Sequence, residues 1–377
     1  MTQFRHTTYG QDIIFGPGAL DQLDTAIEGF GWRRLLMCAS GSARRSGRVA
    51  QIEAMLGERL VAVYDHVKPH VQDFQLAEVL ALAEARDVEA VIGLGGGSPI
   101  GMAKAASYAL EAKRTAAPAR AVPPTAQPLI PVVAIPTTYA GSEMTPVYGI
   151  THTTESPPRK ITVSDPRIAP KLILYDPRLT LDLPPEVTAS TGINAIAHCV
   201  EALYSFSRPP AALAAASEGL RHLARALLQC YYFGDDLEAR TGMLLGSHLA
   251  GVALAGVKMG LHHGLCHVLG GSAGVPHGVA NGIVLPHAMR FNADATPGWG
   301  PRAAESLGLS TLTAEAAAQR VFELIGDLHL PQRLRDAQVP AGDLPHLARL
   351  ACQSRTVQNN PKPVTEAQLT ELLETMW

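Results

Sequence analysis

The residues that decide the fold read AVIGLGGGSPIGMAKAASYAL and run from Ala90 to Leu110. The short apolar run at the start is typical of a buried strand, and the pattern from Met102 onward is helical. Glycines between the two let the backbone approach a pyrophosphate closely, and the N–H groups that open the helix offer a site for an anion. Such turns also occur without a ligand, and this one lacks the GxGxxG spacing and the lysine of a P-loop. The predicted phosphate-binding turn consists of Gly95, Gly96, Gly97 and Ser98.

Outward from this segment, the first half of the chain alternates short apolar runs with helical patterns. This alternation is typical of βαβ units and predicts a parallel, Rossmann-like sheet in an α/β domain. One further strand ends at Ile135 and runs into Pro136, Thr137 and Thr138. Because open α/β sheets bind ligands at the carboxyl ends of neighbouring strands, the two loops together favour a dinucleotide. The predicted strands are Arg34 to Cys38, Leu60 to Tyr64, Ala90 to Leu94, Ile130 to Ile135 and Lys171 to Tyr175.

The composition changes after Pro184 and Pro185, which we take as a domain boundary. Long segments rich in Ala and Leu follow, such as Ala211 to Cys230 and Leu237 to Val257, and they have helical periodicity with almost no strand signal. We therefore expect a dinucleotide-binding α/β domain over residues 1–183 and an all-helical domain over residues 184–377. Two irregular segments are also expected, a surface excursion from Ala116 to Pro128 and a polar, loop-like tail from Gln353 to Lys362.

A chain of 377 residues, of which 47% are hydrophobic and 17% charged, is large enough for two folded domains. Its formal net charge of -3 gives no basic footprint for nucleic acid, and no uninterrupted apolar stretch of about 18 residues predicts a membrane span. The start does not resemble a signal peptide, and the five scattered cysteines form no metal or disulfide pattern. We expect a reduced, cytoplasmic protein that binds a small ligand.

Histidines recur at helical spacing in the second half. Asn194 and His198 are one turn apart, as are His263 and His267, so each pair can point from one helix face into a shared pocket. His277 lies in a Pro-His-Gly turn, which fixes the backbone around its side chain. A single histidine is more often a core or surface residue than a ligand, but five between positions 262 and 287 favour a catalytic site.

The same residues leave two kinds of chemistry open. Imidazoles suit iron, zinc and nickel, but a Lewis-acid site normally adds a carboxylate, and the residue one turn before His198 is Asn194. A neutral amide is a poor ligand for a divalent ion. The alternative is that the histidines act as proton donors and as hosts for anionic oxygen atoms, because imidazoles titrate near neutral pH.

These motifs together resemble those of the iron-containing (group III) alcohol dehydrogenases over nearly the whole chain. The shared pattern is the glycine triplet with Ser, a PTT-x-x-GSE loop, and an H-x-x-x-H pair followed by PHG. The resemblance implies a dinucleotide domain joined to a helical domain, an architecture like that of dehydroquinate synthase. It places metal ligands at residues 194, 198, 263 and 277, and it places His267 near the nicotinamide.

The chain departs from the family pattern at two positions. Asn194 stands where the family has an acidic metal ligand, and Gly101 stands where it usually has an aspartate after the glycine turn. With the run from Thr137 to Thr151, these departures resemble a branch that uses NADH or NADPH to reduce a carbon–carbon double bond during the breakdown of aromatic rings, with no required metal. Its substrates are small unsaturated dicarboxylates that carry a ketone. Hydride then adds to the alkene carbon β to the ketone, and a proton donor completes the reduction.

For such a substrate we expect the histidines to hold the keto and carboxylate oxygens by preorganised hydrogen bonds in place of a metal. The predicted catalytic residues are His198, His263, His267 and His277. The predicted substrate-binding residues are Asn194, Tyr148 and Tyr139, although tyrosines more often pack with a satisfied hydroxyl.

The cofactor is expected to contact Thr137, Thr138 and the glycine turn. The resemblance also implies that Lys160, at the start of a strand-like run, reaches it. The turn after Cys38 offers no acid for the ribose hydroxyls; Ser40 can accept either cofactor, and Arg44 with Arg45 can attract a 2′-phosphate, so NADH and NADPH both stay open.

Three other functions remain as alternatives. The first is an alcohol or aldehyde dehydrogenase that binds iron or zinc through three histidines and a water. The second is an NAD-dependent lyase resembling dehydroquinate synthase, against which the missing carboxylate argues. The third is a non-catalytic NAD-binding protein. We also expect a homodimer in which the extended start, Gln3 to Tyr9 and Asp12 to Phe15, pairs across the interface.

Overall fold

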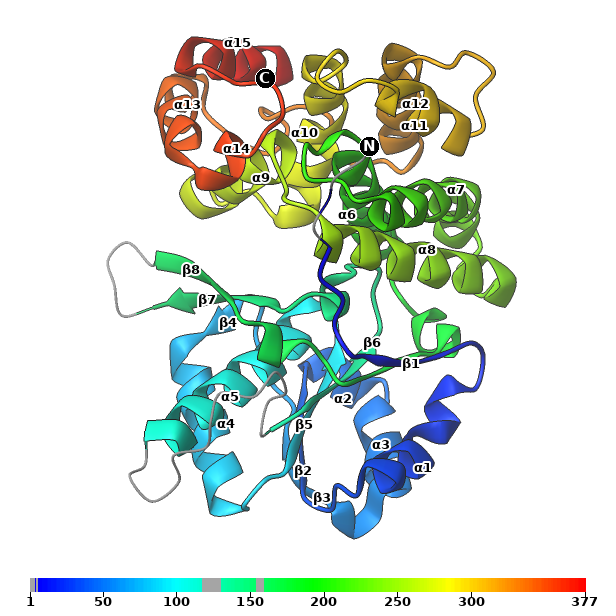
Figure 1. The fold of residues 1–377 in the computed structure, drawn as a ribbon, viewed down its shortest axis with the longest axis vertical. Coiled ribbons are helices and arrows are strands. Elements are labelled where there is room, and N and C mark those ends of the chain that lie inside the picture. Colours follow the sequence, from blue (N-terminus) through cyan, green and yellow to red (C-terminus); the bar gives the residue numbers. More distant parts are fainter. Residues whose placement is uncertain (1–3, 5, 117–129, 154–158) are drawn as a thin grey trace. The chain divides into compact units, whose positions relative to one another are not determined.

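The computed structural model describes residues 4, 6–116, 130–153 and 159–377, and these form two compact units (Figure 1). The first unit comprises Tyr9–Thr138 and Ser142–Thr180. The second comprises Leu181–Trp377 together with Tyr139–Gly141 and the described residues before Tyr9. The first unit ends slightly before the boundary predicted at residues 183/184, and Leu179 still packs in its core. The surface excursion predicted from Ala116 to Pro128 lies, after its first residue, outside the described residues.

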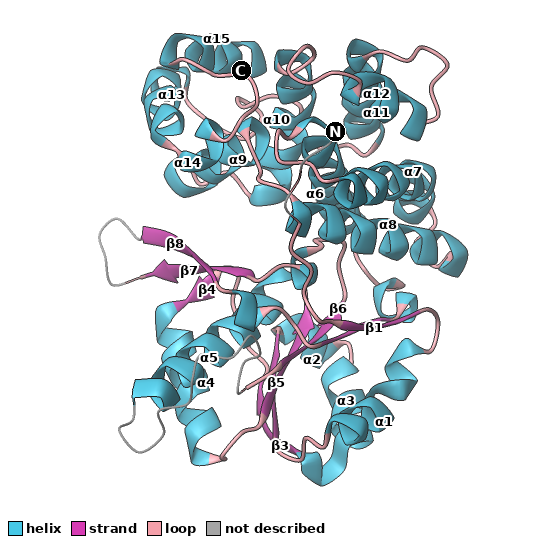
Figure 2. Cartoon of the chain, in the orientation of Figure 1, coloured by secondary structure: helices cyan, strands magenta, loops and turns pink. Residues whose placement is uncertain are grey.

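A sheet forms the centre of the first unit (Figure 2). It has six strands in the order β1-β9-β6-β5-β2-β3. Each neighbouring pair in it is parallel. The strands are β1 (Asp12–Phe15), β2 (Leu35–Ala39), β3 (Leu60–Tyr64), β5 (Ala90–Gly95), β6 (Val132–Pro136) and β9 (Leu172–Tyr175). The four central strands are buried along their whole length, which explains their unbroken apolar runs. All five predicted strands are present, so the predicted parallel sheet is confirmed.

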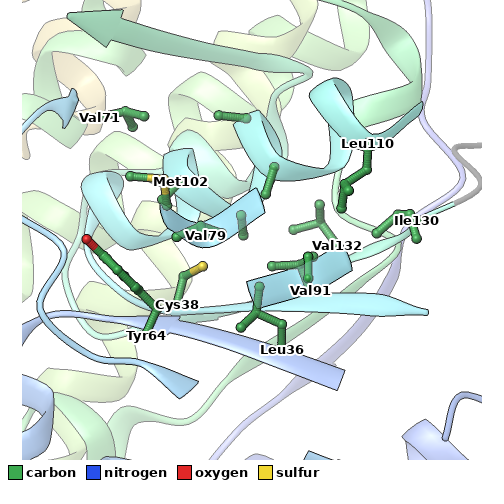
Figure 3. Close-up of a cluster of buried hydrophobic side chains, with 14 of the residues drawn as sticks. Leu36, Cys38, Tyr64, Val71, Val79, Val91, Met102, Leu110, Ile130 and Val132 are labelled. Carbon is green, nitrogen blue, oxygen red and sulfur yellow. The ribbon is translucent and has the colours of Figure 1, made fainter. Parts of the chain in front are cut away.

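Helices cover both faces of this sheet. They are α1 (Leu23–Phe30), α2 (Gly41–Arg45), α3 (Arg48–Leu56), α4 (Asp73–Ala85) and α5 (Gly97–Ala116). On one face α1 and α3 bury Ile27 and Ile52 against the strands. On the other face α4 and α5 contribute Val79 and Met102 to a cluster that includes Val91 of the sheet (Figure 3).

A smaller sheet packs against α5 in the same unit. Its strands are β4 (Val71–Gln72), β7 (Val147–His152) and β8 (Arg159–Ser164), in the order β4-β7-β8. Tyr148 and Ile150 of β7 join the hydrophobic cluster around α5. Gly101 allows this packing, because a Cβ atom there would lie 3.0 Å from Cγ2 of Val71. A side chain at this position would therefore require the Val71 side chain of β4 to move by a few tenths of an ångström.

The second unit is built from helices. They are α6 (Pro185–Tyr204), α7 (Pro210–Tyr232), α8 (Leu237–Gly256), α9 (Leu261–Ser272), α10 (His277–Phe291), α11 (Trp299–Ser306), α12 (Ala314–Asp327), α13 (Leu344–Gln353), α14 (Arg355–Gln358) and α15 (Glu366–Met376). The predicted fold class, an α/β unit followed by a helical unit, is confirmed. Among the described helices, none is by itself long and apolar enough to cross a membrane. The helices α8 and α9, which meet at an angle of 98°, reach that length and apolar character only when they are taken together. All five cysteines are free.

The tail predicted to be loop-like from Gln353 to Lys362 contains the short helix α14, so that prediction is wrong in part. Val357 of α14 is buried in the same core as Leu265 of α9. The two helices approach closely at Gly264, where a Cβ atom would lie 2.8 Å from the backbone nitrogen of Val357. A single apolar residue in a polar stretch therefore anchors a turn of helix that composition does not reveal.

Candidate active site

The glycine turn and the loop after β6 lie against each other in the first unit. Gly95 has φ 137°, a conformation that side chains rarely adopt, and its carbonyl oxygen accepts a hydrogen bond from the Thr137 nitrogen at 3.1 Å. A Cβ atom on Gly96 would lie 3.1 Å from Oγ1 of Thr138. The following helix, α5, begins at Gly97. Its first N–H groups, which have no acceptor within the helix, therefore lie where the two loops meet. The structure thus brings the predicted glycine turn together with Thr137 and Thr138.

Two serine hydroxyls lie near this turn. Oγ of Ser98 accepts a hydrogen bond from the His70 nitrogen at 3.1 Å. Oγ of Ser142 is buried without a hydrogen-bond partner among the described residues, 3.7 Å from the position of a Cβ atom on Gly97. Because buried hydroxyls are nearly always hydrogen-bonded, Ser142 is a candidate ligand-binding residue. Sequence reasoning missed it, although it belongs to the GSE motif.

The residues predicted to govern the ribose lie at the start of α2. Ser40 caps this helix, and its Oγ lies 2.8 Å from Oγ of Ser42. Arg44 pairs with Glu53 at 3.1 Å and also donates to Asp65, the residue directly after β3. The turn after Cys38 itself contains no acid, but Asp65 at the end of the neighbouring strand lies beside it. Asp65 and Glu53 already neutralise the guanidinium that was expected to attract a 2′-phosphate.

Lys160 lies in β8 opposite Thr151, and its side chain is outside the described part of the chain.

The histidines of the second unit converge from three helices. His198 comes from α6, His263 and His267 come from α9, and α10 begins at His277. The rings of His198 and His263 are stacked with centroids 4.6 Å apart, and the ring of His263 lies 6.4 Å from that of His267 and 6.3 Å from that of His277. His198 and His263 are buried, whereas His267 and His277 are exposed. The four predicted catalytic histidines thus form one cluster that runs from the interior to the surface of this unit.

Glu201 is the residue of this cluster that sequence reasoning missed. Its fully buried carboxylate accepts hydrogen bonds from the backbone nitrogens of Gly260 at 3.0 Å and His262 at 3.2 Å, at the start of α9. It also accepts one from Nδ1 of His263. Burial alone would raise the pKa of Glu201, but His263 and His262 hold it well below its ordinary value. The available signal was its spacing, because residue 201 lies one turn after His198 on the same face of α6.

The contact with Glu201 fixes how His263 is presented. Because Nδ1 faces the carboxylate, Nε2 is the ring nitrogen that remains available to a ligand. This buried atom has no hydrogen-bond partner among the described residues. Nδ1 of His198 and Oδ1 of Asn194 are also buried, and neither has a hydrogen-bond partner among the described residues. Burial lowers the pKa of His198 and of His263, which favours neutral rings. Several unsatisfied polar atoms in one cluster indicate a place for a ligand.

Two sets of atoms here have the chemistry of a metal site. Glu201, His262 and His263 offer ligand atoms within 4.8 Å of one another. The ligand atoms of this set already contact one another. The Nδ1 atoms of the two histidines are 3.1 Å apart, and both lie near the Glu201 carboxylate. The buried atoms without hydrogen-bond partners among the described residues lie instead on Asn194, His198 and His263, and with the ring of His277 these form an outer set. Imidazole nitrogens suit a divalent transition metal, and a carboxylate behind one of the ligating rings is a common arrangement in such sites.

The two tyrosines predicted to bind substrate occupy different units. Tyr139 is fully buried in the second unit, and its hydroxyl accepts a hydrogen bond from Nη1 of Arg240 at 3.0 Å. That hydroxyl, predicted to meet the substrate, is therefore engaged in the scaffold. Tyr148 lies in β7 of the first unit beside Tyr108, and burial raises its pKa to about 12.

Comparisons with known proteins identify the family. Residues 10–177 match the model of the iron-containing alcohol dehydrogenases, and residues 188–377 match the C-terminal model of the Fe-containing alcohol dehydrogenase family. The chain belongs to this family, an oxidoreductase family, as the sequence motifs indicated.

Among its relatives, maleylacetate reductase of Pseudomonas knackmussii is 36% identical over 370 residues, which cover 98% of this chain and 96% of that protein. The crystal structure of maleylacetate reductase from Agrobacterium tumefaciens is 30% identical with a TM-score of 0.87, and covers 100% of this chain and 99% of that one. A 1,3-propanediol oxidoreductase structure is 29% identical with a TM-score of 0.90 over the whole of both chains.

Proposed function

We propose that this chain reduces the carbon–carbon double bond of maleylacetate to give 3-oxoadipate, with NADH or NADPH as the reductant. The similarity to maleylacetate reductases over nearly the full length supports this substrate. The observation that carries the proposal is Asn194, whose buried amide oxygen has no partner among the described residues and which replaces the acidic ligand implied by the resemblance. The side-chain amide offers an acceptor at Oδ1 and a donor at Nδ2, and the donor can bind a substrate oxygen, whereas a carboxylate would repel a dianionic substrate.

In the proposed reaction hydride from the reduced nicotinamide reaches the alkene carbon β to the ketone. The electron pair of the double bond moves onto the carbonyl oxygen, and a proton then adds to the carbon next to the ketone. Asn194 and the N–H of neutral His198 donate hydrogen bonds to the oxygen that becomes negative. The exposed rings of His267 and His277 exchange protons with solvent, and one of them supplies the proton.

A dinucleotide pyrophosphate fits beside the glycine turn, Thr137 and Thr138. The N–H groups at the start of α5 lie at this place, and such groups can bind an anion. The acid beside Arg44 favours the ribose hydroxyls of NADH over a 2′-phosphate. Apparent affinities for NADH and NADPH test this preference, and a lower KM for NADPH would contradict it.

The proposed turnover requires no metal. His198, His263 and His277 would hold a divalent ion if one were bound, and it would polarise a carbonyl oxygen as a Lewis acid. A second candidate, an iron- or zinc-dependent alcohol dehydrogenase, is favoured by one observation. His263 donates from Nδ1 to Glu201, so its neutral ring presents a bare nitrogen at Nε2, which suits a metal ligand better than a hydrogen-bond donor.

Metal-stripped protein separates the two candidates. It is mixed with NADH and maleylacetate while the nicotinamide absorbance is followed, with a metal analysis of the same sample. We expect oxidation of NADH without added metal and no activity on simple alcohols or aldehydes. An absence of oxidation that is reversed by iron or zinc would establish the second candidate instead.

We further propose a cytoplasmic homodimer. β1 pairs on one side with β9 and is the terminal strand of the main sheet, so among the described strands its other edge is open. An open edge can pair with the same strand of a second copy. Light scattering in solution measures the mass, and the mass of a single chain would contradict the proposal.

A further inference from the structure

Lys104 is a buried lysine in α5, and its three hydrogen-bond contacts match the three N–H groups of an ammonium. The residue is 1% exposed, and Nζ donates to the carbonyl oxygens of Ser142 at 2.7 Å, Thr145 at 2.8 Å and Val147 at 3.1 Å. An ammonium has three donors, so the match is complete. These carbonyls belong to one short segment, 142–147, which is thereby held at three points by the Lys104 side chain.

The same segment has its own internal contacts. Residues Ser142–Met144 form a 3-10 turn, and Oγ1 of Thr145 also donates to the Ser142 carbonyl at 2.8 Å. With a further bond from the Thr145 backbone nitrogen at 3.0 Å, the Ser142 carbonyl accepts three hydrogen bonds. They fix the backbone of the residue whose Oγ is buried without a partner among the described residues.

Lys104 and the glycine turn are parts of one rigid element. α5 begins at Gly97 and carries Lys104 two turns later, so the helix that receives the phosphate also holds segment 142–147. The other side of the loop is tied to the turn directly, through Thr137 and the Gly95 carbonyl. Segments on both sides of residues 139–141 are thus fixed relative to the same glycine turn.

Packing alone does not account for a lysine here. Removing an ammonium from water is costly, and an apolar side chain of the same length would fill the space without that cost. Glu143, which is 1% exposed, is the charged neighbour that offsets part of it, and its carboxylate accepts a hydrogen bond from the Tyr175 hydroxyl at 2.9 Å. Three carbonyl contacts from one point are the property that an apolar residue cannot supply.

We propose that Lys104 is a positioning residue that holds Ser142 in place to bind a phosphate of the dinucleotide. The inference rests on the proposed use of a nicotinamide cofactor, and it adds a phosphate ligand and the residue that orients it. In this arrangement the hydroxyl of Ser142 donates to a phosphate oxygen beside the first N–H groups of α5.

The test compares Lys104→Met and Ser142→Ala with Lys113→Met, a control on the same helix whose exposed lysine pairs with Glu84. NADH fluorescence gives the dissociation constant without maleylacetate, so a wrong substrate assignment leaves this result unaffected. We expect Lys104→Met and Ser142→Ala each to weaken NADH binding by about tenfold, and Lys113→Met by less than about twofold. In Lys104→Met the loss should appear in KM for NADH more than in kcat for maleylacetate.

Hydrogen exchange of residues 139–150 supplies a second readout for Lys104→Met. We expect faster exchange in the free variant and stronger protection on NADH binding than in the wild type, because the cofactor then orders the segment. If Lys104→Met fails to fold, Ser142→Ala decides the question by itself. Unchanged NADH affinity in Ser142→Ala, or equal losses of kcat and affinity in Lys104→Met, would overturn the proposal. A wild-type chain that binds neither NADH nor NADPH would overturn both this inference and the proposed cofactor.

Discussion

Nδ1 of His263 donates a hydrogen bond to the buried carboxylate of Glu201, and this contact determines which nitrogen of the ring faces the other histidines. The same carboxylate accepts from the first N–H groups of α9, the helix that carries His263 and His267. Negative charge at a helix N-terminus is favourable, so one residue both stabilises α9 and orients the ring of His263. Glu201 therefore links the stability of the helical unit to its chemistry.

Replacing Glu201 with Gln should lower turnover of maleylacetate by about tenfold to a hundredfold. The amide holds the His263 ring less firmly, and His263 stacks on His198, which donates to the substrate oxygen in the proposed reaction. Steady-state kinetics measure the change, and Glu218→Gln on the surface of α7 is the matched control. Equal kcat in the two variants would show that the orientation of His263 does not matter for the reaction.

Glu201 should also make the stability of the protein depend on pH. Its pKa lies below the ordinary value of 4.5 in the folded state, so its contribution is present above pH 4.5 and is lost as the pH falls toward the folded-state pKa. At pH 7 we expect Glu201→Gln to lower the free energy of unfolding by about 3 kcal/mol. The difference from the wild type should shrink below pH 4.5. Urea unfolding at a series of pH values measures it, and a constant difference would contradict the assignment.

Asn194→Asp should restore an acidic ligand beside the histidines. We expect zinc affinity to rise by about tenfold or more, since a charged oxygen binds a cation more strongly than an amide. Maleylacetate turnover should fall, because a carboxylate repels the dianionic substrate. Calorimetry with zinc measures the first effect, and adding His198→Ala should abolish the gain. A variant that binds zinc no better than the wild type would place the metal ligands elsewhere.

The two tyrosines predicted to bind substrate should behave differently. Tyr139→Phe removes an acceptor of Arg240 and should cost about 1 kcal/mol of stability, with KM for maleylacetate unchanged. If Tyr148 binds substrate as predicted, Tyr148→Phe should raise KM by about tenfold. Thermal unfolding and kinetics on both variants decide, and a higher KM in Tyr139→Phe would return that residue to the substrate site.

Much of the fold could be predicted because its signals are local. A few neighbouring residues are enough to indicate an apolar strand, the glycine turn or a helix rich in Ala and Leu. One histidine pair is likewise spaced by a single helical turn. What could not be predicted depends on contacts between distant segments. Asp65 reaches Arg44 from the neighbouring strand, and the Tyr139 hydroxyl meets Arg240 from a helix a hundred residues later. In the same way, the role of Glu201 appears only when α9 begins at its carboxylate.

The contact between Gly264 and α14 has a consequence for the last part of the chain. Gly264 stands between His263 and His267, and the backbone of Val357 closes on it where no Cβ atom would fit. The C-terminal residues thus serve as a buttress behind the two histidines that we propose for the active site. Altering that support, by a larger residue at 264 or by loss of the tail, would shift both imidazoles although neither histidine is itself replaced.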